Sequence, residues 1–104
     1  MKLLTKELIK KLPPLRSQSE KESKDIPIII KFFHPFSEWT WYVAEGEQTE
    51  SGDWEFFGLV RGDFVELGSF MLSDLESLKV RGLGIERDMY FGNHTIAEAE
   101  EKRL

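Results

Sequence analysis

Apolar side chains recur at every second position through most of the segment between residues 28 and 70. The clearest alternation is in residues 39–44, where one set of side chains, Trp39, Trp41 and Val43, alternates with a second set, Thr40, Tyr42 and Ala44. A period of two is the pattern of β-strands, because successive side chains of a strand point to opposite faces of its sheet. The segment therefore predicts a sheet in which the tryptophan face is buried and the Tyr42 face is partly open.

Four strands are predicted in this segment, over residues 28–33, 39–44, 54–61 and 64–70. The third and fourth are separated by Gly62-Asp63, which predicts a two-residue type II′ turn because glycine readily adopts the positive φ of the first turn position. Such short connections favour an antiparallel meander. Residues 85–91 alternate more weakly and are a candidate fifth strand.

Three short helices are expected around this sheet. Residues 5–12 carry one apolar stripe, with Thr5 as the N-cap and two prolines directly after the last turn. Capping-box patterns, in which Ser or Thr is followed three residues later by Glu, open two more helices at Ser73 and at Thr95. The last helix, over about residues 95–103, has only a thin apolar stripe and is expected to be weak.

The expected fold class is α+β, with an antiparallel meander of four or five strands packed by two or three short helices. Residues 1–104 are expected to form a single domain. Residues 17–23 contain no apolar side chain, so a mobile loop is expected over about residues 16–25. The sheet and helix body then covers about residues 26–92.

Charge divides the chain unevenly. Residues 1–24 carry a net charge of +4, whereas residues 25–104 carry −9. The acidic part repels phosphate backbones, so it is not expected to bind nucleic acid. No apolar run is long enough to cross a membrane, and the early charges at the N-terminus are unlike those of a signal peptide. A cytoplasmic protein without a membrane partner is therefore expected.

No cofactor and no metal site are expected. The chain has no cysteine, and its two histidines, His34 and His94, show no metal-ligand spacing. Both histidines stand in turn-like sequence, where a solvated or capping role is the usual one. The glycines form no nucleotide-binding motif.

Aromatic side chains are the densest group of candidate recognition residues. Eleven of the thirteen fall between Phe32 and Phe70. Two outcomes stay open: one face of the sheet is a groove for a partner, or a helix covers each face. Because Trp and Tyr combine a large contact area with a polar tip, Trp39, Trp41 and Tyr42 are candidate binding residues.

A second candidate group is charged. Arg87 stands between Glu86 and Asp88, and Glu45 follows the second predicted strand. If the fold gathers these residues, they form either a structural ion-pair network or an anion-binding or catalytic cluster. Arg87 itself is expected to need a carboxylate or carbonyl partner, and carboxylates on neighbouring strands, Glu45 or Glu66, are the first candidates. No residue is assigned a catalytic role.

Several short stretches resemble a bacterial family, domain-of-unknown-function family 2958. The most specific are Trp39–Tyr42 and Ile85–Asp88, supported by Leu12–Leu15, Lys31–Phe33 and Phe56–Gly58. The similarity runs over nearly the whole chain. It implies a small single-domain bacterial protein, often encoded on plasmids and other mobile elements, with no established activity and no assigned site residues.

The leading hypothesis is a non-enzymatic protein- or peptide-binding module linked to mobile elements, which binds through the aromatic side of its sheet. Its acidic body favours a basic partner or mimics a polyanion. The alternative is a small hydrolase-like enzyme that acts on a small polar substrate through the carboxylates beside Arg87. The oligomeric state is left open.

Overall fold

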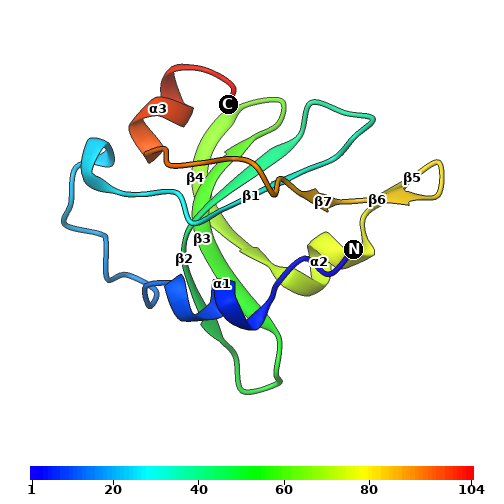
Figure 1. Cartoon of the computed structure of the whole chain (residues 1–104), viewed down its shortest axis with the longest axis horizontal. Helices are drawn as coiled ribbons and strands as arrows, with labels where there is room; N and C mark the ends of the chain where they lie inside the picture. The colour runs from blue at the N-terminus through cyan, green and yellow to red at the C-terminus, as the bar shows by residue number, and fades with distance from the viewer.

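The computed structural model describes all residues from Met1 to Leu104 and contains a five-stranded antiparallel sheet (Figure 1). The strands are β1 (Ile30–Phe33), β2 (Thr40–Gln48), β3 (Trp54–Arg61), β4 (Val65–Met71) and β7 (Glu86–Arg87). Their order across the sheet is β4-β3-β2-β1-β7. The first four strands therefore form the predicted meander, and the α+β class is confirmed.

Helices lie on both sides of this sheet (Figure 1). They are α1 (Lys6–Lys11), α2 (Leu72–Ser77) and α3 (Ile96–Glu101). The chain also contains a 3-10 turn, η1 (Ser23–Asp25), and a small hairpin formed by β5 (Lys79–Val80) and β6 (Leu83–Gly84). The Thr5 hydroxyl accepts the Leu8 N–H at the start of α1, and Thr95 forms a capping box with Glu98 at the start of α3. Both predicted caps are confirmed.

One face of the sheet packs against α1, α2 and the N-terminal residues. The buried residues of this first core are Leu3, Leu4, Ile30, Phe32, Trp41, Val43, Phe56, Leu75 and Ile85. Trp41 and Val43 are buried here as predicted, but Trp39 is 40% exposed. Its ring lies over Gly62, where a Cβ atom would come within 2.4 Å of the indole.

The opposite face is also covered, so the prediction of a partly open Tyr42 face is wrong. The buried residues of this second core are Ile28, Tyr42, Ala44, Leu59, Ile96 and Ala99. Two of them, Ile96 and Ala99, come from α3, whose thin apolar stripe is completely buried. A helix therefore lies on each face of the sheet, and α3 covers Tyr42.

A β-bulge interrupts the pairing of β2 with β3. Val43 lies opposite Gly58, but Glu45 lies opposite Phe57, so β2 has one extra residue between these pairs. The two backbones approach so closely that a Cβ atom on Gly58 would lie 1.8 Å from the Tyr42 carbonyl oxygen. Only glycine fits at this position. The extra residue turns Glu45 to the face that Ala44 occupies, and both line the same groove.

The predicted type II′ turn between the third and fourth strands is wrong. Three residues, Gly62 to Phe64, connect β3 to β4, and Gly62 does not have a positive φ. Its lack of a side chain serves the packing of the Trp39 ring instead. A turn with positive φ at both central residues, Arg81 and Gly82, closes the β5–β6 hairpin.

Two further local predictions need correction. Ser73 does not cap α2, because the helix begins at Leu72 after Met71, and the Ser73 hydroxyl donates to the Asp53 carboxylate instead. Of the predicted strand over residues 85–91, only Glu86–Arg87 pairs with β1. The Asp88 N–H still donates to the Lys31 carbonyl of β1 (3.0 Å), and the chain then turns away as the Tyr90 N–H donates to the Asp88 carboxylate (2.9 Å).

Candidate functional site

The β4 edge is the longest stretch of the sheet without a neighbour. β4 is the outermost of the five strands on its side. No backbone hydrogen bond outside the regular helices and strands involves any residue from Val65 to Met71. The outer N–H and C=O groups of β4 therefore face solvent, which makes this edge a template for a further strand.

The pattern of hydrogen bonds along β4 shows which of its groups point outward. The Gly62 N–H donates to the Phe64 carbonyl at 2.9 Å in the loop before the strand. Bonded and non-bonded pairs alternate along an antiparallel ladder, so the even-numbered residues of β4 bond to β3. The odd-numbered residues consequently direct their N–H and C=O groups away from the sheet: Val65, Leu67 and Ser69.

Apolar side chains accompany this free backbone. Val65 is 45% exposed and Leu67 is 52% exposed, and the preceding Phe64 is 76% exposed. Trp39 lies against Gly62 in the same loop. Trp39 packs beside Trp41 (5.9 Å between ring centroids) on the first-core face, whereas Val65 and Leu67 project on the opposite face, toward the second core.

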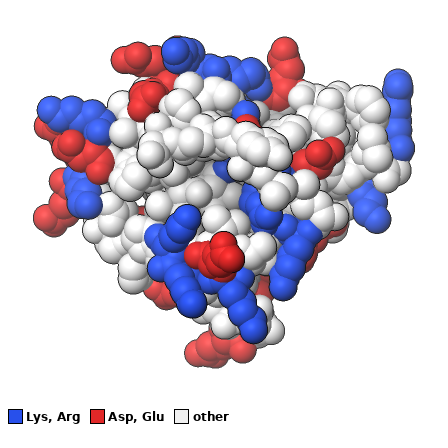
Figure 2. All heavy atoms as spheres, viewed as in Figure 1, with Lys and Arg blue, Asp and Glu red and all other residues white.

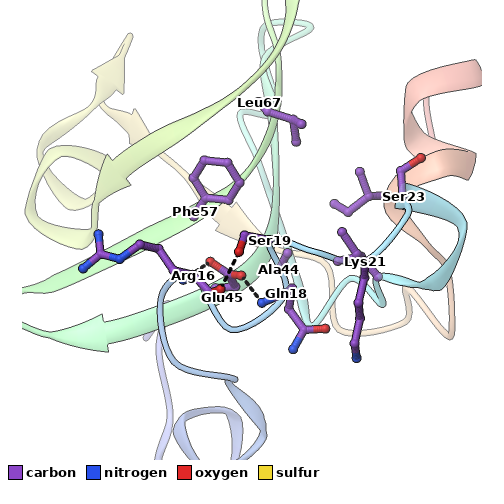
Figure 3. A pocket seen from close by; sticks show the side chains of 11 residues that line it. Arg16, Gln18, Ser19, Lys21, Ser23, Ala44, Glu45, Phe57 and Leu67 are labelled. Atoms are coloured by element: carbon purple, nitrogen blue, oxygen red, sulfur yellow. Dashed lines mark hydrogen bonds between the residues drawn. The ribbon is translucent and has the colours of Figure 1, made fainter.

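A groove of about 300 Å³ adjoins the edge on the α3 face of the sheet. Phe57 and Leu67 point from β3 and β4 toward the segment that carries Arg16, Ser19 and Lys21 (Figure 3). The other apolar residues along the groove are Ile26, Ala44 and Ile96. Five of its eleven lining residues are apolar, and the other six are polar or charged, most of them from the segment that follows Arg16.

Glu45 holds the segment that forms one wall of this groove, residues 16–23, which we call the strap. Its carboxylate accepts the N–H groups of Arg16 and Gln18, each at 2.8 Å (Figure 3). Glu45 is only 3% exposed and has no basic side chain within salt-bridge distance. Arg16 adopts a φ of 70°, a conformation that a non-glycine residue holds only where its surroundings enforce it. The mobility predicted for residues 16–25 stays a prediction, but the path of the strap depends on Glu45.

The three aromatic residues singled out from the sequence do not form one surface. Trp41 lies in the first core and Tyr42 in the second, on opposite faces of β2. The Tyr42 hydroxyl donates to the Leu104 carbonyl (3.2 Å) and accepts the Leu104 N–H (3.0 Å), so it anchors the C-terminal residue. Trp39 alone of the three reaches the surface.

The charged residues singled out from the sequence are not gathered into one cluster. Glu45 lies on the part of β2 beyond its pairing with β1, whereas Glu86 and Arg87 lie on β7, on the far side of β1. Two strand spacings alone separate them by about 10 Å. Asp88 pairs with Lys31 at 3.4 Å. The four-residue cluster that the hydrolase alternative required is therefore not formed.

Arg87 binds the N-terminal chain instead of a carboxylate. Its guanidinium donates to the Lys2 carbonyl (2.8 Å) and the Leu3 carbonyl (3.1 Å). The prediction of Glu45 or Glu66 as its partner is wrong, because backbone carbonyl groups near the N-terminus accept the hydrogen bonds of the guanidinium. The Arg87 N–H also faces the Met1 sulfur at 3.1 Å. Residues 1–3 thus cover the β7 edge.

The two histidines have separate structural partners. The His34 ring is buried: Nδ1 accepts the Phe36 N–H (3.1 Å), so Nε2 carries the proton that faces the Leu83 carbonyl (3.2 Å). This is a capping role, and a solvated one is excluded. His94 lies beside Glu98 at 3.1 Å, and its hydrogen bond is the main cause that lowers the pKa of the Glu98 carboxyl. No three His, Asp or Glu side chains are grouped closely enough to hold a metal ion.

Lysines are concentrated on α1, whereas the stretch from Glu38 to Glu76 is strongly acidic. Lys and Arg atoms gather over the lower middle of the face in Figure 2, where Figure 1 draws α1, whose sequence contains three lysines. Ten carboxylates fall between Glu38 and Glu76, and none of them forms a salt bridge. Arg61, the one basic residue in that span, donates to the Ala99 carbonyl at 2.9 Å. The β3–β4–α2 region therefore carries uncompensated negative charge.

Sequence reasoning missed the β4 edge and the groove beside it. The available signal was the alternation of Val65, Glu66 and Leu67, which places two apolar side chains on one face of a strand. That alternation predicts a strand but does not show that its apolar face stays exposed. The groove also depends on the strap and on α3, neither of which has a local pattern that places it there.

Comparison with known proteins identifies the family. The family described as "Protein of unknown function (DUF2958)" matches residues 3–99. No curated protein matches the chain, and no solved structure matches it. None of the helices has the length and apolar character to span a membrane. Because the match spans almost the whole sequence, the chain belongs to the DUF2958 family.

Proposed function

We propose that the protein is a binding module that takes up an extended segment of a partner protein as an additional strand beside β4. The observation that carries this proposal is the outward row of unpaired N–H and C=O groups at Val65, Leu67 and Ser69. Main-chain hydrogen bonds along such an edge supply affinity in strand addition, while neighbouring pockets select the side chains.

The edge has few of the devices that usually prevent strand addition, and its one charged residue is Glu66. Exposed edges are commonly blunted by proline, by lysine, by a bulge or by very short length. β4 has seven residues, contains neither proline nor lysine, and pairs with β3 without a register shift. An edge that is long, regular and partly apolar supports a role in binding.

The groove adds side-chain selection to this backbone template. Residues of a strand beside β4 would alternate between the two faces of the sheet. Those on the α3 face would lie against Leu67 at the open side of the groove, with Phe57 beyond it. Of the residues singled out from the sequence, Glu45 acts indirectly by holding the strap, and Trp39 lies on the other face of the sheet, beside Trp41.

The link to mobile elements belongs to this proposal as well. The resemblance implied it, and it makes the partner a protein of the element or of its bacterial host. Examination of the neighbouring genes tests this part. Transfer or maintenance genes beside the coding sequence would support it, and a fixed chromosomal setting without such genes would contradict it.

A matched pair of variants tests strand addition. Ser69 is exposed, and its N–H points outward, so Ser69→Pro removes a donor of the free edge without removing a bond to β3. Ser69→Ala keeps the N–H and removes only the hydroxyl. Peptides selected from a random phage-displayed library on the unmodified protein are then titrated against both variants. We expect Ser69→Pro to raise Kd by roughly tenfold or more and Ser69→Ala to change it little.

Two results would overturn the proposal. The first is a selection that enriches no peptide above an empty surface. The second is a set of selected peptides that bind Ser69→Pro as tightly as Ser69→Ala. The melting temperature of each variant is measured first, because the comparison requires that both remain folded.

A further inference from the structure

We infer that the segment bound beside β4 alternates apolar and basic side chains, with apolar residues on the groove face and a Lys or Arg opposite Glu66. This inference rests on the proposed strand addition and adds the chemistry of the partner. In paired strands, residues directly opposite each other project on the same face of the sheet. The side chains of β4 therefore determine what each face of the partner strand meets.

The groove face selects apolar side chains. Val65 and Leu67 project on this face, next to the groove floor formed with Phe57. Arg16 and Lys21 stand at the groove margin, and both are exposed. A basic side chain entering here would be desolvated against an apolar floor beside two other cations, so this face disfavours it.

The opposite face selects a cation. Glu66 is exposed on β4 and has no basic side chain within salt-bridge distance. The next residue on the same face is Gly68, and a Cβ atom there would have no neighbour within 4 Å. This leaves an uncovered strip along which the stem of a long Lys or Arg side chain can lie while its head reaches the Glu66 carboxylate.

Neighbouring charges reinforce that selection. Asp74 and Glu76 are exposed on α2, which packs on the same face through Leu75, and Asp63 is exposed in the loop before β4. None of these carboxylates is paired. Arg61 projects on the groove face and is bound to α3. These carboxylates attract a cationic partner to the β4–α2 part of this face and repel an anionic one, whereas the lysines of α1 lie on the same face of the sheet.

Two peptides of opposite charge test the inference. One alternates valine with lysine over about eight residues, the length of an ordinary strand, and its twin has glutamate in place of each lysine. Binding of each labelled peptide is measured by fluorescence anisotropy at low and at high salt. We expect the lysine peptide to bind more tightly, with an advantage that shrinks as salt screens the charges.

Charge reversal locates the effect. Glu66→Lys is expected to weaken the lysine peptide and to strengthen the glutamate peptide, each by roughly fivefold. Glu50→Lys is the matched control, because Glu50 is also exposed but lies in the β2–β3 turn, and the change in net charge is the same. A control that shifts the two peptides as much as Glu66→Lys would overturn the inference, since net charge alone would then explain the preference.

The outcomes separate this inference from the proposed function. If both peptides bind equally and Ser69→Pro weakens both, strand addition stands and the charge preference is wrong. If the lysine peptide binds Ser69→Pro as tightly as Ser69→Ala, strand addition itself is wrong, and the attraction is one of surface charge only.

Discussion

The two edges of the sheet differ in what covers them. At one edge, β7 has only two residues, and residues 1–3 lie against it through the hydrogen bonds of Arg87. At the other edge, β4 has seven residues, and no segment of the chain pairs with its outer side. The chain therefore covers one edge of its sheet with its own N-terminal residues and leaves the other edge uncovered. The longer and more apolar edge is the one left open.

The comparison also shows what closing an edge requires. Residues 1–3 are held by one side chain, Arg87, and by the burial of Leu3 in the first core. β4 contributes no buried residue to either core, and Val65 and Leu67 remain about half exposed on the groove face. Covering this edge would need a further segment, and in our proposal the partner supplies it.

The largest expected effect is the difference in stability between two leucine variants, one at each edge of the sheet. Leu3 is 4% exposed, so Leu3→Ala removes buried methyl groups and is expected to lower the free energy of unfolding by about 2–4 kcal/mol. Leu67 is 52% exposed, so Leu67→Ala is expected to change it by less than about 0.5 kcal/mol. Urea denaturation of both variants measures the difference. Equal losses would show that the edges are equally packed.

A smaller effect is expected at Arg87. Its side chain is half-buried and donates hydrogen bonds to two carbonyl oxygens. In Arg87→Ala, water can replace some of these hydrogen bonds. We expect a loss of about 1–2 kcal/mol, less than for a fully enclosed guanidinium. Arg87→Lys, which keeps the charge but has a single donor group, should fall between. Faster hydrogen exchange in residues 1–4 of Arg87→Ala would show that the closed edge has opened, and unchanged exchange would contradict its role there.

The smallest effect concerns Asp53, which fixes the end of the open strand. Its carboxylate accepts the Ser73 hydroxyl, the Trp54 N–H (2.8 Å) and the Ser73 N–H (3.1 Å), and these bonds lower its pKa below 3.8, the Ser73 hydroxyl most. A carboxyl whose pKa is lowered by folding stabilises the protein above its unfolded pKa and loses that contribution as the pH falls through the folded value. Asp53 therefore helps to hold the start of α2, directly after β4, at neutral pH.

Melting temperatures of the unmodified protein and of Asp53→Asn test this dependence. We expect a small difference at pH 6 that shrinks progressively below about pH 4, where the unmodified carboxyl becomes protonated. A difference that stays constant down to pH 2 would mean that the charge of Asp53 does not contribute.

Local patterns were sufficient for the strands and for two of the helix caps. The alternation around Trp41 determines which side chains share a face, because the period of a strand is a property of its backbone. Thr5 and Thr95 cap helices because a hydroxyl can accept an N–H two or three residues further along. The same kind of pattern misled at Ser73, where the Asp53 carboxylate binds the hydroxyl instead.

The candidate site could not be predicted in the same way. The bulge that turns Glu45 toward the groove arises where β2 meets β3 at Gly58. No sequence pattern around Glu45 predicts this bulge. The carbonyl partners of Arg87 lie more than eighty residues away in the chain. Main-chain carbonyls carry no sequence signal, so only the folded chain shows that they reach this guanidinium.

The sequence by itself determined that this chain forms an antiparallel sheet with short capped helices, because propensity, period and capping act over a few residues. Only the tertiary structure decided that α3 covers Tyr42, that residues 1–3 close the β7 edge and that β4 stays open. The physical reason is that the burial of a side chain depends on which segments, often far apart in the chain, pack against it. A strand pattern states which side chains favour burial, but the rest of the fold determines whether anything reaches them.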